Sequence, residues 1–429
     1  MARIINVGLI GLGTVGTGVA QHLEKRGKQF GMQLKTIAVA NKKKSRDTKI
    51  PLTTNVDAII NDPAIDIVVE LIGGIQEAKD YIVKALKNKK SVVTANKAVL
   101  ARYTKEIFST ARENSVDVAF EASVGGGIPI IQILRSLRGE KITKIMGILN
   151  GTTNYILTCM EEGLTFEKAL NAAQKNGFAE KNHILDTGGF DARDKLAILA
   201  MLVYNTQINP DEIHCEGITN ITPIDLDFAK RYGEFEGNTG YTIKLLAIAD
   251  NGNDTVHLRV HPALIPSTHP LASVKNEVNA VYFEGELAGP QLHTGRGAGR
   301  LATTSAVFAD IIRVAQNIRR HTTEDLPTLD GKTAFDDANE LERPGYIRTH
   351  LLDEPGSGAE AYSILAKHGL NIGNSVQSLK YEQRVRGKLF VPDIVTVRAV
   401  SENRMKKVLN DLRRSKRVIG KPIFIRFEE

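Results

Sequence analysis

The charged residues between positions 180 and 195 have types and spacings that could bind a polar substrate and move a proton. The stretch contains four carboxylates and one lysine: Glu180, Asp186, Asp191, Asp194 and Lys195. Lys195 follows Asp191 by four positions, so on a helix both side chains would project from one face. An ammonium held beside a carboxylate can bind a polar substrate or donate a proton to it. The simpler alternative is a solvated first helical turn with an ordinary ion pair.

The first thirty residues predict a dinucleotide site. An apolar run at 3–10 leads into Gly11-Leu12-Gly13-Thr14-Val15-Gly16, and a helical pattern follows to about Phe30. In a G-x-G-x-x-G motif between strand and helix, Gly11 allows the tight turn, Gly13 lets the backbone approach a pyrophosphate, and Gly16 lets helix and strand pack closely. The helix that opens at Thr14 and Val15 would offer N–H donors to the phosphates.

Strand and helix patterns then alternate along the first 130 residues. Apolar strands are predicted at 34–40, 66–72, 91–95 and 116–121, with helices at 77–89 and 98–114. Near-continuous apolar strands separated by helices indicate a parallel, Rossmann-type sheet covered on both faces. Ligands bind at the carboxyl ends of such strands. Gly73, Thr94 and Lys97 follow strand ends and are therefore candidate cofactor contacts.

The loop after the second predicted strand bears on cofactor choice. It contains Lys42, Lys43, Lys44 and Arg46, and no carboxylate occurs before Asp47. An NAD-specific site would carry an acidic residue here for the ribose 2′-hydroxyl, whereas cations suit a 2′-phosphate. The loop favours NADP(H). A merely solvated basic loop and the additional use of NAD stay open.

The middle of the chain contains two small-residue loops that could bind ligands. Glu121-Ala122-Ser123-Val124-Gly125-Gly126-Gly127-Ile128-Pro129 can expose its backbone to a ligand. A helix at 130–137 and a strand at 143–149 follow, and then the polar turn 150–154, which includes Thr152. Period-2 stretches at 255–264 and 280–284 predict strands of an open sheet, and 303–318 predicts a helix that returns to the cofactor domain.

Taken together, these motifs resemble the homoserine dehydrogenase family. The resemblance lies in G-L-G-T-V-G at 11–16, T-A-N-K at 94–97, E-A-S-V-G-G-G-I-P at 121–129, G-I-L-N-G-T-T-N at 147–154, the 177–195 segment and G-A-G at 297–299. Their order and spacing agree along residues 1–320. The resemblance implies reversible, NADP(H)-linked hydride transfer between L-homoserine and L-aspartate 4-semialdehyde, on the route to threonine, methionine and isoleucine.

The resemblance also implies roles for individual residues. Lys195 would donate a proton to the aldehyde oxygen, Lys97 would lie between nicotinamide and substrate, and Asp186 and Asp191 would order the site. Glu180 would bind the substrate amino group. A further set is implied by position in the shared motifs: Thr152 at the substrate, Gly299 at the cofactor, and Glu121, Val124, Gly126 and Ile128 at a monovalent cation such as Na⁺.

Two positions depart from the family pattern. The family's usual Asp-Pro after the substrate-binding glutamate is replaced by Asn182-His183, and the usual Pro-Thr before the long helix is Ala302-Thr303. Neither change removes a proposed catalytic group. Asn182-His183 alters charge and stiffness beside Glu180, which leaves open another amino-acid aldehyde or ketone as substrate.

The last hundred residues predict a separate module. Residues 321–344 are polar and predict a linker, and a strand–helix–strand–strand–helix–strand pattern follows over 345–429. That order resembles an ACT domain, with Asp353-Glu354-Pro355-Gly356 at its first turn. The resemblance implies an amino-acid effector such as threonine; a dimerisation module without ligand is the alternative. The expected division is a cofactor domain at 1–130 completed by helix 303–320, a substrate and dimerisation domain at 131–302, the linker, and this module.

Composition excludes several other classes of protein. With 42% hydrophobic and 24% charged residues the chain is typical of globular proteins, and its net charge of +7 suits anionic metabolites and phosphorylated cofactors. The cations are scattered and lack the interleaved aromatic residues of nucleic-acid binding sites. Two distant cysteines and no long apolar run predict a cytoplasmic protein without a membrane partner, and we expect a homodimer or homotetramer. A non-catalytic nucleotide sensor is the remaining alternative; Lys97, Glu180, Asp191 and Lys195 argue against it.

Overall fold

The computed structural model describes residues 3–46, 48–235, 240–251 and 255–428. The protein divides into two compact units, each assembled from separate segments of the chain. Unit 1 contains Met1–Gly151, Asp191–Glu212 and Val278–Thr333, and unit 2 contains Thr152–Phe190, Ile213–Glu277 and Ala334–Glu429. The chain passes between the units several times, and helix α9 (Phe190–Tyr204) begins at one of these passages.

Unit 1 contains a six-stranded parallel sheet in the order β3-β2-β1-β4-β5-β6. Its strands are β1 (Ile5–Ile10), β2 (Met32–Ala38), β3 (Leu52–Thr53), β4 (Ile67–Glu70), β5 (Ser91–Thr94) and β6 (Val118–Ala119). Every residue of β4 and β5 is buried, as expected for a sheet covered on both faces. The predicted Rossmann-type sheet is confirmed. Its strand order reverses between β1 and β4, and such a reversal marks the ligand-binding edge of this fold.

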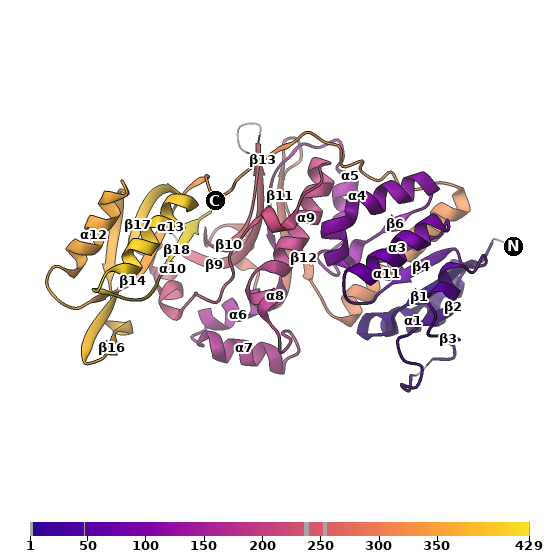
Figure 1. Cartoon of the computed structure of the whole chain (residues 1–429), viewed down its shortest axis with the longest axis horizontal. Coiled ribbons are helices and arrows are strands. Elements are labelled where there is room, and N and C mark those ends of the chain that lie inside the picture. The colour runs from indigo at the N-terminus through magenta and orange to yellow at the C-terminus, as the bar shows by residue number, and fades with distance from the viewer. Residues whose placement is uncertain (1–2, 47, 236–239, 252–254, 429) are drawn as a thin grey trace. The chain divides into compact units, whose positions relative to one another are not determined.

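Helices from two distant parts of the chain cover this sheet. They are α1 (Thr14–Arg26), α2 (Asp57–Ile60), α3 (Gln76–Lys87), α4 (Lys97–Asn114) and α11 (Arg300–Arg320). Figure 1 shows α11, in orange, among the indigo and purple elements of unit 1. Its buried residues Val307, Ile311 and Val314 join one apolar core with β1 and α1. The helix that follows the G-A-G motif is therefore part of the nucleotide-binding fold.

The rest of unit 1 includes a short antiparallel arrangement in the order β12-β11-β7. Its strands are β7 (Ile142–Ile148), β11 (Val278–Gly285) and β12 (Gly289–Arg296), and helix α5 (Ile130–Ser136) precedes them. The sequence predicted β7 and β11 but not β12. The residues of β12, G-P-Q-L-H-T-G-R, include two glycines and a proline, which are depleted in strands.

Unit 2 combines helices with a sheet that contains both parallel and antiparallel strand pairs. The helices are α6 (Gly151–Glu161), α7 (Phe166–Lys175), α8 (Ile184–Thr187), α10 (Pro223–Phe235), α12 (Ser357–Lys367) and α13 (Glu402–Arg414). The main strands are β9 (Tyr241–Asn251), β10 (Thr255–Pro266), β14 (Glu342–Leu352), β15 (Ile372–Gln377), β17 (Lys388–Ser401) and β18 (Val418–Phe427), in the order β9-β10-β18-β14-β17-β15. Short strands β8 (His214–Cys215) and β13 (Ala334–Asp336) pair with β10, and β16 (Gln383–Val385) pairs with β17.

The C-terminal elements β14, α12, β15, β17, α13 and β18 have the expected strand–helix–strand–strand–helix–strand order, but the short strand β16, which was not expected, lies between β15 and β17. Their apolar core includes Ile347, Leu365, Val395 and Val408. These elements are continuous with the rest of unit 2, because β18 pairs in parallel with β10. Residues 321–344, expected as a linker, include β13 and the first residues of β14.

The described part of the chain contains α-helices of 4 to 21 residues. None of its helices combines the length and the apolar character needed to cross a bilayer.

Candidate active site

Two lysines and a carboxylate meet in unit 1. Asp191 and Lys195 are one turn apart in α9, and both are buried. Lys195 Nζ donates to Asp191 Oδ2 and to the Leu149 carbonyl oxygen, both at 2.7 Å. Lys97 Nζ lies 2.7 Å from Asp191 Oδ1, and the Asn150 amide donates to Asp191 Oδ2 at 2.9 Å. The i,i+4 pair is therefore a buried cluster rather than a solvated helical turn.

The charges of this cluster keep Asp191 ionised. Burial by itself would raise the pKa of the Asp191 carboxyl. The ammonium groups of Lys195 and Lys97 outweigh burial and hold that pKa well below its usual range. One anion thus faces two cations, which leaves the cluster with a net positive charge.

Lys97 is placed by the end of β5 and the start of α4. Asn96 caps α4 by accepting from the Val99 amide, and its own amide donates to the Gly74 carbonyl at 2.9 Å. Thr94, the last residue of β5, donates its hydroxyl to the Glu70 carboxylate at 2.6 Å. Thr94 is fully buried, so its hydrogen bond to Glu70 joins the ends of β5 and β4 inside the protein.

The Leu149 carbonyl is fixed by a residue from a distant part of the chain. Asn279, in β11, donates its amide to Leu149 O at 2.9 Å and is 1% exposed. Leu149 follows the end of β7, which pairs with β11. The acceptor that holds Lys195 is therefore positioned by the antiparallel strands.

The glycine-rich motif has the geometry that a pyrophosphate needs. Gly11 has φ +98°, and a Cβ there would lie 2.6 Å from Leu71 O. A Cβ at Gly16 would lie 2.1 Å from Gly11 O, so helix and strand pack too closely for any side chain. Apart from its two chain neighbours, no described residue has an atom within 4 Å of the Cβ position at Gly13, which leaves its backbone open to a ligand.

A cavity of about 480 Å³ adjoins this motif. Gly13 and Thr14 line it on one side, and Lys44, Arg46 and Arg300 add three cations. Arg46 donates to the carbonyl oxygens of Asn41 and Lys44 at 2.7 and 3.0 Å, which shapes the loop. Lys42 and Lys43 lie earlier in the same loop, outside the lining. Arg300, the first residue of α11, was not predicted.

Residues 180–189, which the sequence predicts to bind substrate, belong to unit 2, as does Thr152. Glu180 is exposed, and Asp186 is half-buried in α8. Thr152, near the start of α6, is buried and donates its hydroxyl to the Phe178 carbonyl, which fixes the chain just before this loop.

The glycine loop at 121–128 is largely buried in unit 1. The Glu121 carboxylate accepts the amides of Ile131 and Gln132 at 2.8 and 3.1 Å, so it is engaged at the start of α5. Burial raises the pKa of this carboxyl to about 7. Gly125 and Gly126 have positive φ values of 71° and 55°.

Comparison with known proteins decides the family. A family model described as homoserine dehydrogenase matches residues 129–312, and one described as homoserine dehydrogenase, NAD binding domain, matches residues 11–121. The homoserine dehydrogenase of Bacillus subtilis (strain 168) is 39% identical over 387 residues, which cover 87% of this chain and 88% of that protein. The chain belongs to the homoserine dehydrogenase family.

Solved structures agree with this assignment. A homoserine dehydrogenase from Thiobacillus denitrificans is 35% identical with a TM-score of 0.88, over 100% of both chains. A hyperthermophilic archaeal homoserine dehydrogenase in complex with NADPH is 26% identical with a TM-score of 0.62, over 73% of this chain and 98% of that chain. This member of the family is thus an oxidoreductase with an NAD(P)-binding domain.

Sequence reasoning named only part of the residues now seen around the lysines. Lys97, Asp191 and Lys195 were named, and they are in contact. Glu70 and Asn279 were not named, because an acid at a strand end and an asparagine in a strand carry no sequence signal of their own. For Asn150 the sequence predicts only a place in the polar turn 150–154.

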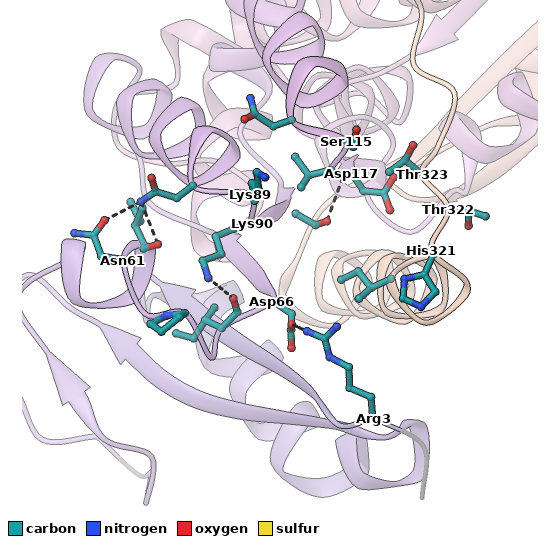
Figure 2. Close-up of a pocket in the computed structure, with 18 residues that line it drawn as sticks. Arg3, Asn61, Asp66, Lys89, Lys90, Ser115, Asp117, His321, Thr322 and Thr323 are labelled. Atoms are coloured by element: carbon teal, nitrogen blue, oxygen red, sulfur yellow. Dashed lines mark hydrogen bonds and ion pairs between the residues drawn. The ribbon is translucent and has the colours of Figure 1, made fainter.

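A larger cavity in unit 1 lies away from these residues. It has a volume of about 1220 Å³ and opens at the amino ends of the parallel strands, between residues such as Arg3, Lys90 and Asp117. Figure 2 shows that Lys90 and Arg3 point to partners within the protein. Lys90 Nζ donates to the Asp62 and Ile65 carbonyls at 2.7 Å, and Arg3 pairs with Asp66. Its position opposite the glycine motif separates it from the nucleotide site.

Proposed function

We propose that this member of the family catalyses reversible, NADP(H)-linked hydride transfer between L-homoserine and L-aspartate 4-semialdehyde, with Lys195 as proton donor. The observation that carries the proposal is the buried contact of Lys195 with both Asp191 and Leu149 O. That contact fixes the Lys195 ammonium on α9. Lys97, which pairs with the same carboxylate, is the first residue of α4 and follows the end of β5.

The chemistry follows from these charges. When bound, the cofactor would supply the hydride from its reduced nicotinamide, and negative charge would develop on the aldehyde oxygen. Lys195 and Lys97 stabilise that charge, and Lys195 donates a proton to the oxygen. Asp191 remains ionised throughout, because it orients the two ammonium groups rather than exchanging a proton. In the oxidative direction the same lysine takes the proton back.

Substrate binding is assigned to the loop of unit 2. We place the Glu180 carboxylate against the substrate amino group, with Asp186 and Thr152 ordering the loop around it. The exposure of Glu180 supports this role, because a carboxylate without burial can meet an incoming cation at little desolvation cost.

The cofactor preference is assigned to the basic cavity. Lys44, Arg46 and Arg300 line the same space as Gly13 and Thr14, and their charges suit the 2′-phosphate of NADP(H). Lys42 and Lys43 add to the positive field of the loop. Val15, Gly73 and Gly299 complete the backbone contacts of the proposed cofactor site.

A monovalent cation fits the 121–128 loop. The Glu121 carboxylate is occupied by two backbone amides, so a cation there would be held by main-chain oxygens of Glu121, Val124, Gly126 and Ile128. Such an ion would supply positive charge that stabilises the loop. Among the described residues no cluster of acids, histidines and cysteines suits a metal held by side chains.

We assign residues 345–428 as an ACT-like regulatory module whose effector is an amino acid such as threonine. The strand–helix–strand–strand–helix–strand order and the Asp353–Gly356 turn support this assignment. We also propose that the protein is a homodimer or homotetramer, acting on the route to threonine, methionine and isoleucine.

One assay tests the reaction and its regulation. NADPH oxidation is followed with L-aspartate 4-semialdehyde, with NADH in parallel and threonine added in increasing concentration. The proposal predicts turnover, a lower KM for NADPH than for NADH, and inhibition by threonine. Bound NADPH without turnover would contradict the substrate assignment and direct attention to Asn182-His183 and another aldehyde.

A further inference from the structure

The substrate loop (residues 180–189) ends directly on another segment of unit 2. This bridging segment (residues 214–225) starts in β8 and continues to the first turn of α10. The Ile218 amide donates to the Thr187 carbonyl at 2.9 Å, and Cys215 Sγ donates to the Gly188 carbonyl at 3.4 Å. A Cβ at Gly217 would lie only 2.0 Å from Thr187 O. The end of the loop therefore has no room to move toward the segment.

The other side of the bridging segment is anchored by two buried arginines from the C-terminal strands. Arg426, in β18, pairs with Glu216 and is 3% exposed. Arg348, in β14, donates to the Asp225 carboxylate at 2.8 Å and to the Asn220 carbonyl at 3.0 Å. Each end of the segment thus has its own ionic anchor on the module.

The Arg426 anchor is shared with a second acid. Its Nε and Nη2 face the two carboxylate oxygens of Glu402, and Nη1 is left for Glu216. A forked contact of this kind fixes the guanidinium plane and therefore the direction of the remaining donor. Glu216 in turn holds its backbone amide against Val260 O in β10, at 2.7 Å.

We propose that Glu216 is a positioning residue for the substrate loop, and that its pairing with Arg426 sets substrate affinity from the C-terminal module. This inference rests on the proposed role of residues 180–189 in binding substrate. The pair touches no reacting group, so it acts through Gly217 and Ile218 on Thr187 and Gly188. Loss of the Glu216–Arg426 pair would make the bridging segment more mobile. Glu180 and Asp186 would then occupy a wider range of positions.

The test compares two isosteric variants that each remove one carboxylate charge from the contacts of the module. Glu216→Gln weakens the anchor of the bridging segment but leaves Arg426 paired with Glu402. Asp250→Asn is the matched control, because Asp250 in β9 pairs with Arg259 and with Arg343 of β14 without touching the segment. Both variants weaken the pairing of a buried arginine, so a general loosening of unit 2 would appear in both.

The proposal predicts a split between kinetic constants. Glu216→Gln raises KM for L-aspartate 4-semialdehyde about three- to thirty-fold, while kcat and the KM for NADPH stay within about twofold. Asp250→Asn leaves all three constants near the wild-type values. An unchanged substrate KM in Glu216→Gln, or an equal rise in Asp250→Asn, overturns the proposal.

A second variant tests the contact between the bridging segment and the substrate loop without changing any charge. Gly217→Ala places a methyl group against Thr187 O and should raise the substrate KM in the same way. Glu180→Gln separates this inference from the function on which it rests. If Glu180→Gln raises the substrate KM and both bridging-segment variants do not, only the positioning role fails. If Glu180→Gln also leaves that KM unchanged, the assignment of the loop to substrate binding fails.

Discussion

Asp191 accepts hydrogen bonds from three side chains through its two carboxylate oxygens, and it is therefore the residue that holds the site together. Lys97 takes one oxygen, and Lys195 and Asn150 share the other. Because Asp191 and Lys195 are nearly inaccessible to water, each charge depends on the other for compensation. The carboxylate therefore supports both the position of the proton donor and the stability of α9.

Replacing Asp191 by asparagine should destabilise unit 1. Asp191→Asn keeps the shape of the side chain but leaves the buried Lys195 ammonium without an anion, which should cost about 3 kcal/mol in the free energy of unfolding. Urea denaturation measures this loss. Asp211→Asn is the control, because Asp211 is largely exposed and pairs with Arg193 at the surface. Equal losses in the free energy of unfolding of the two variants would show that the buried pair stabilises the protein no more than an exposed pair does.

Thr94 should matter for stability rather than for direct cofactor contact. Thr94→Val removes the hydroxyl that donates to Glu70 and leaves a buried carboxyl short of a partner, at a cost of about 1–3 kcal/mol. Thermal unfolding measures the change, with the less buried Thr53→Val as control. If Thr94→Val instead weakens NADPH binding by more free energy than it removes from unfolding, Thr94 contacts the cofactor.

At the scale of elements, the sequence predicted those that carry a regular pattern and missed those defined by distant contacts. Most of the parallel strands and the longer helices that cover them have clear apolar periods, and Gly11–Gly16 has a mechanism for each glycine, so these were predicted, whereas the short helix α2 was not. β3 and β12 are short or glycine-containing and have no such period. The Asn279–Leu149 contact joins residues 130 positions apart, which no local pattern can reveal.

The loop at residues 41–46 gives a prediction about cofactor choice. The double variant Lys44→Ala/Arg46→Ala removes two cations from the cavity beside Gly13 and should raise the Kd for NADPH much more than that for NADH. Fluorescence titration of both cofactors measures the ratio. The control Lys25→Ala/Lys28→Ala removes the same charge from exposed positions at the end of α1 and beyond. A parallel loss for NADPH and NADH would contradict the 2′-phosphate assignment.

β8 gives a prediction about pH. Burial lowers the pKa of His214 to about 4 in the folded protein, below its usual value of about 6.5. The unfolded chain therefore takes up a proton first on acidification, so stability falls as pH drops from about 6.5 to about 4. Between pH 8 and pH 5 this histidine should account for roughly 2 kcal/mol of that loss.

His214→Gln isolates this contribution. The variant should lose less stability than the wild type when urea denaturation at pH 8 is compared with that at pH 5. Identical losses in the two proteins would mean that the proton uptake on unfolding arises elsewhere.

At the scale of the whole molecule, the two units each combine segments that are far apart in the sequence. The expected divisions at residues 130, 302 and 344 follow composition and pattern, whereas the observed units follow contacts. One reason is Glu428, which pairs in a buried position with Arg259 of β10 and attaches the end of the chain to an early strand of unit 2. The candidate site was easier to predict than these units, because its motifs are short and their spacing is specific.

The role of Lys195 as proton donor is tested by the steady-state rate of NADPH oxidation with L-aspartate 4-semialdehyde. The rate is compared between the wild type and Lys195→Ala, and the Kd for NADPH is measured in parallel. If Lys195 is the proton donor, kcat falls by about 10²- to 10⁴-fold while the Kd for NADPH stays within about twofold. A kcat within a few-fold of the wild type, with NADPH binding intact, would contradict the proposed mechanism.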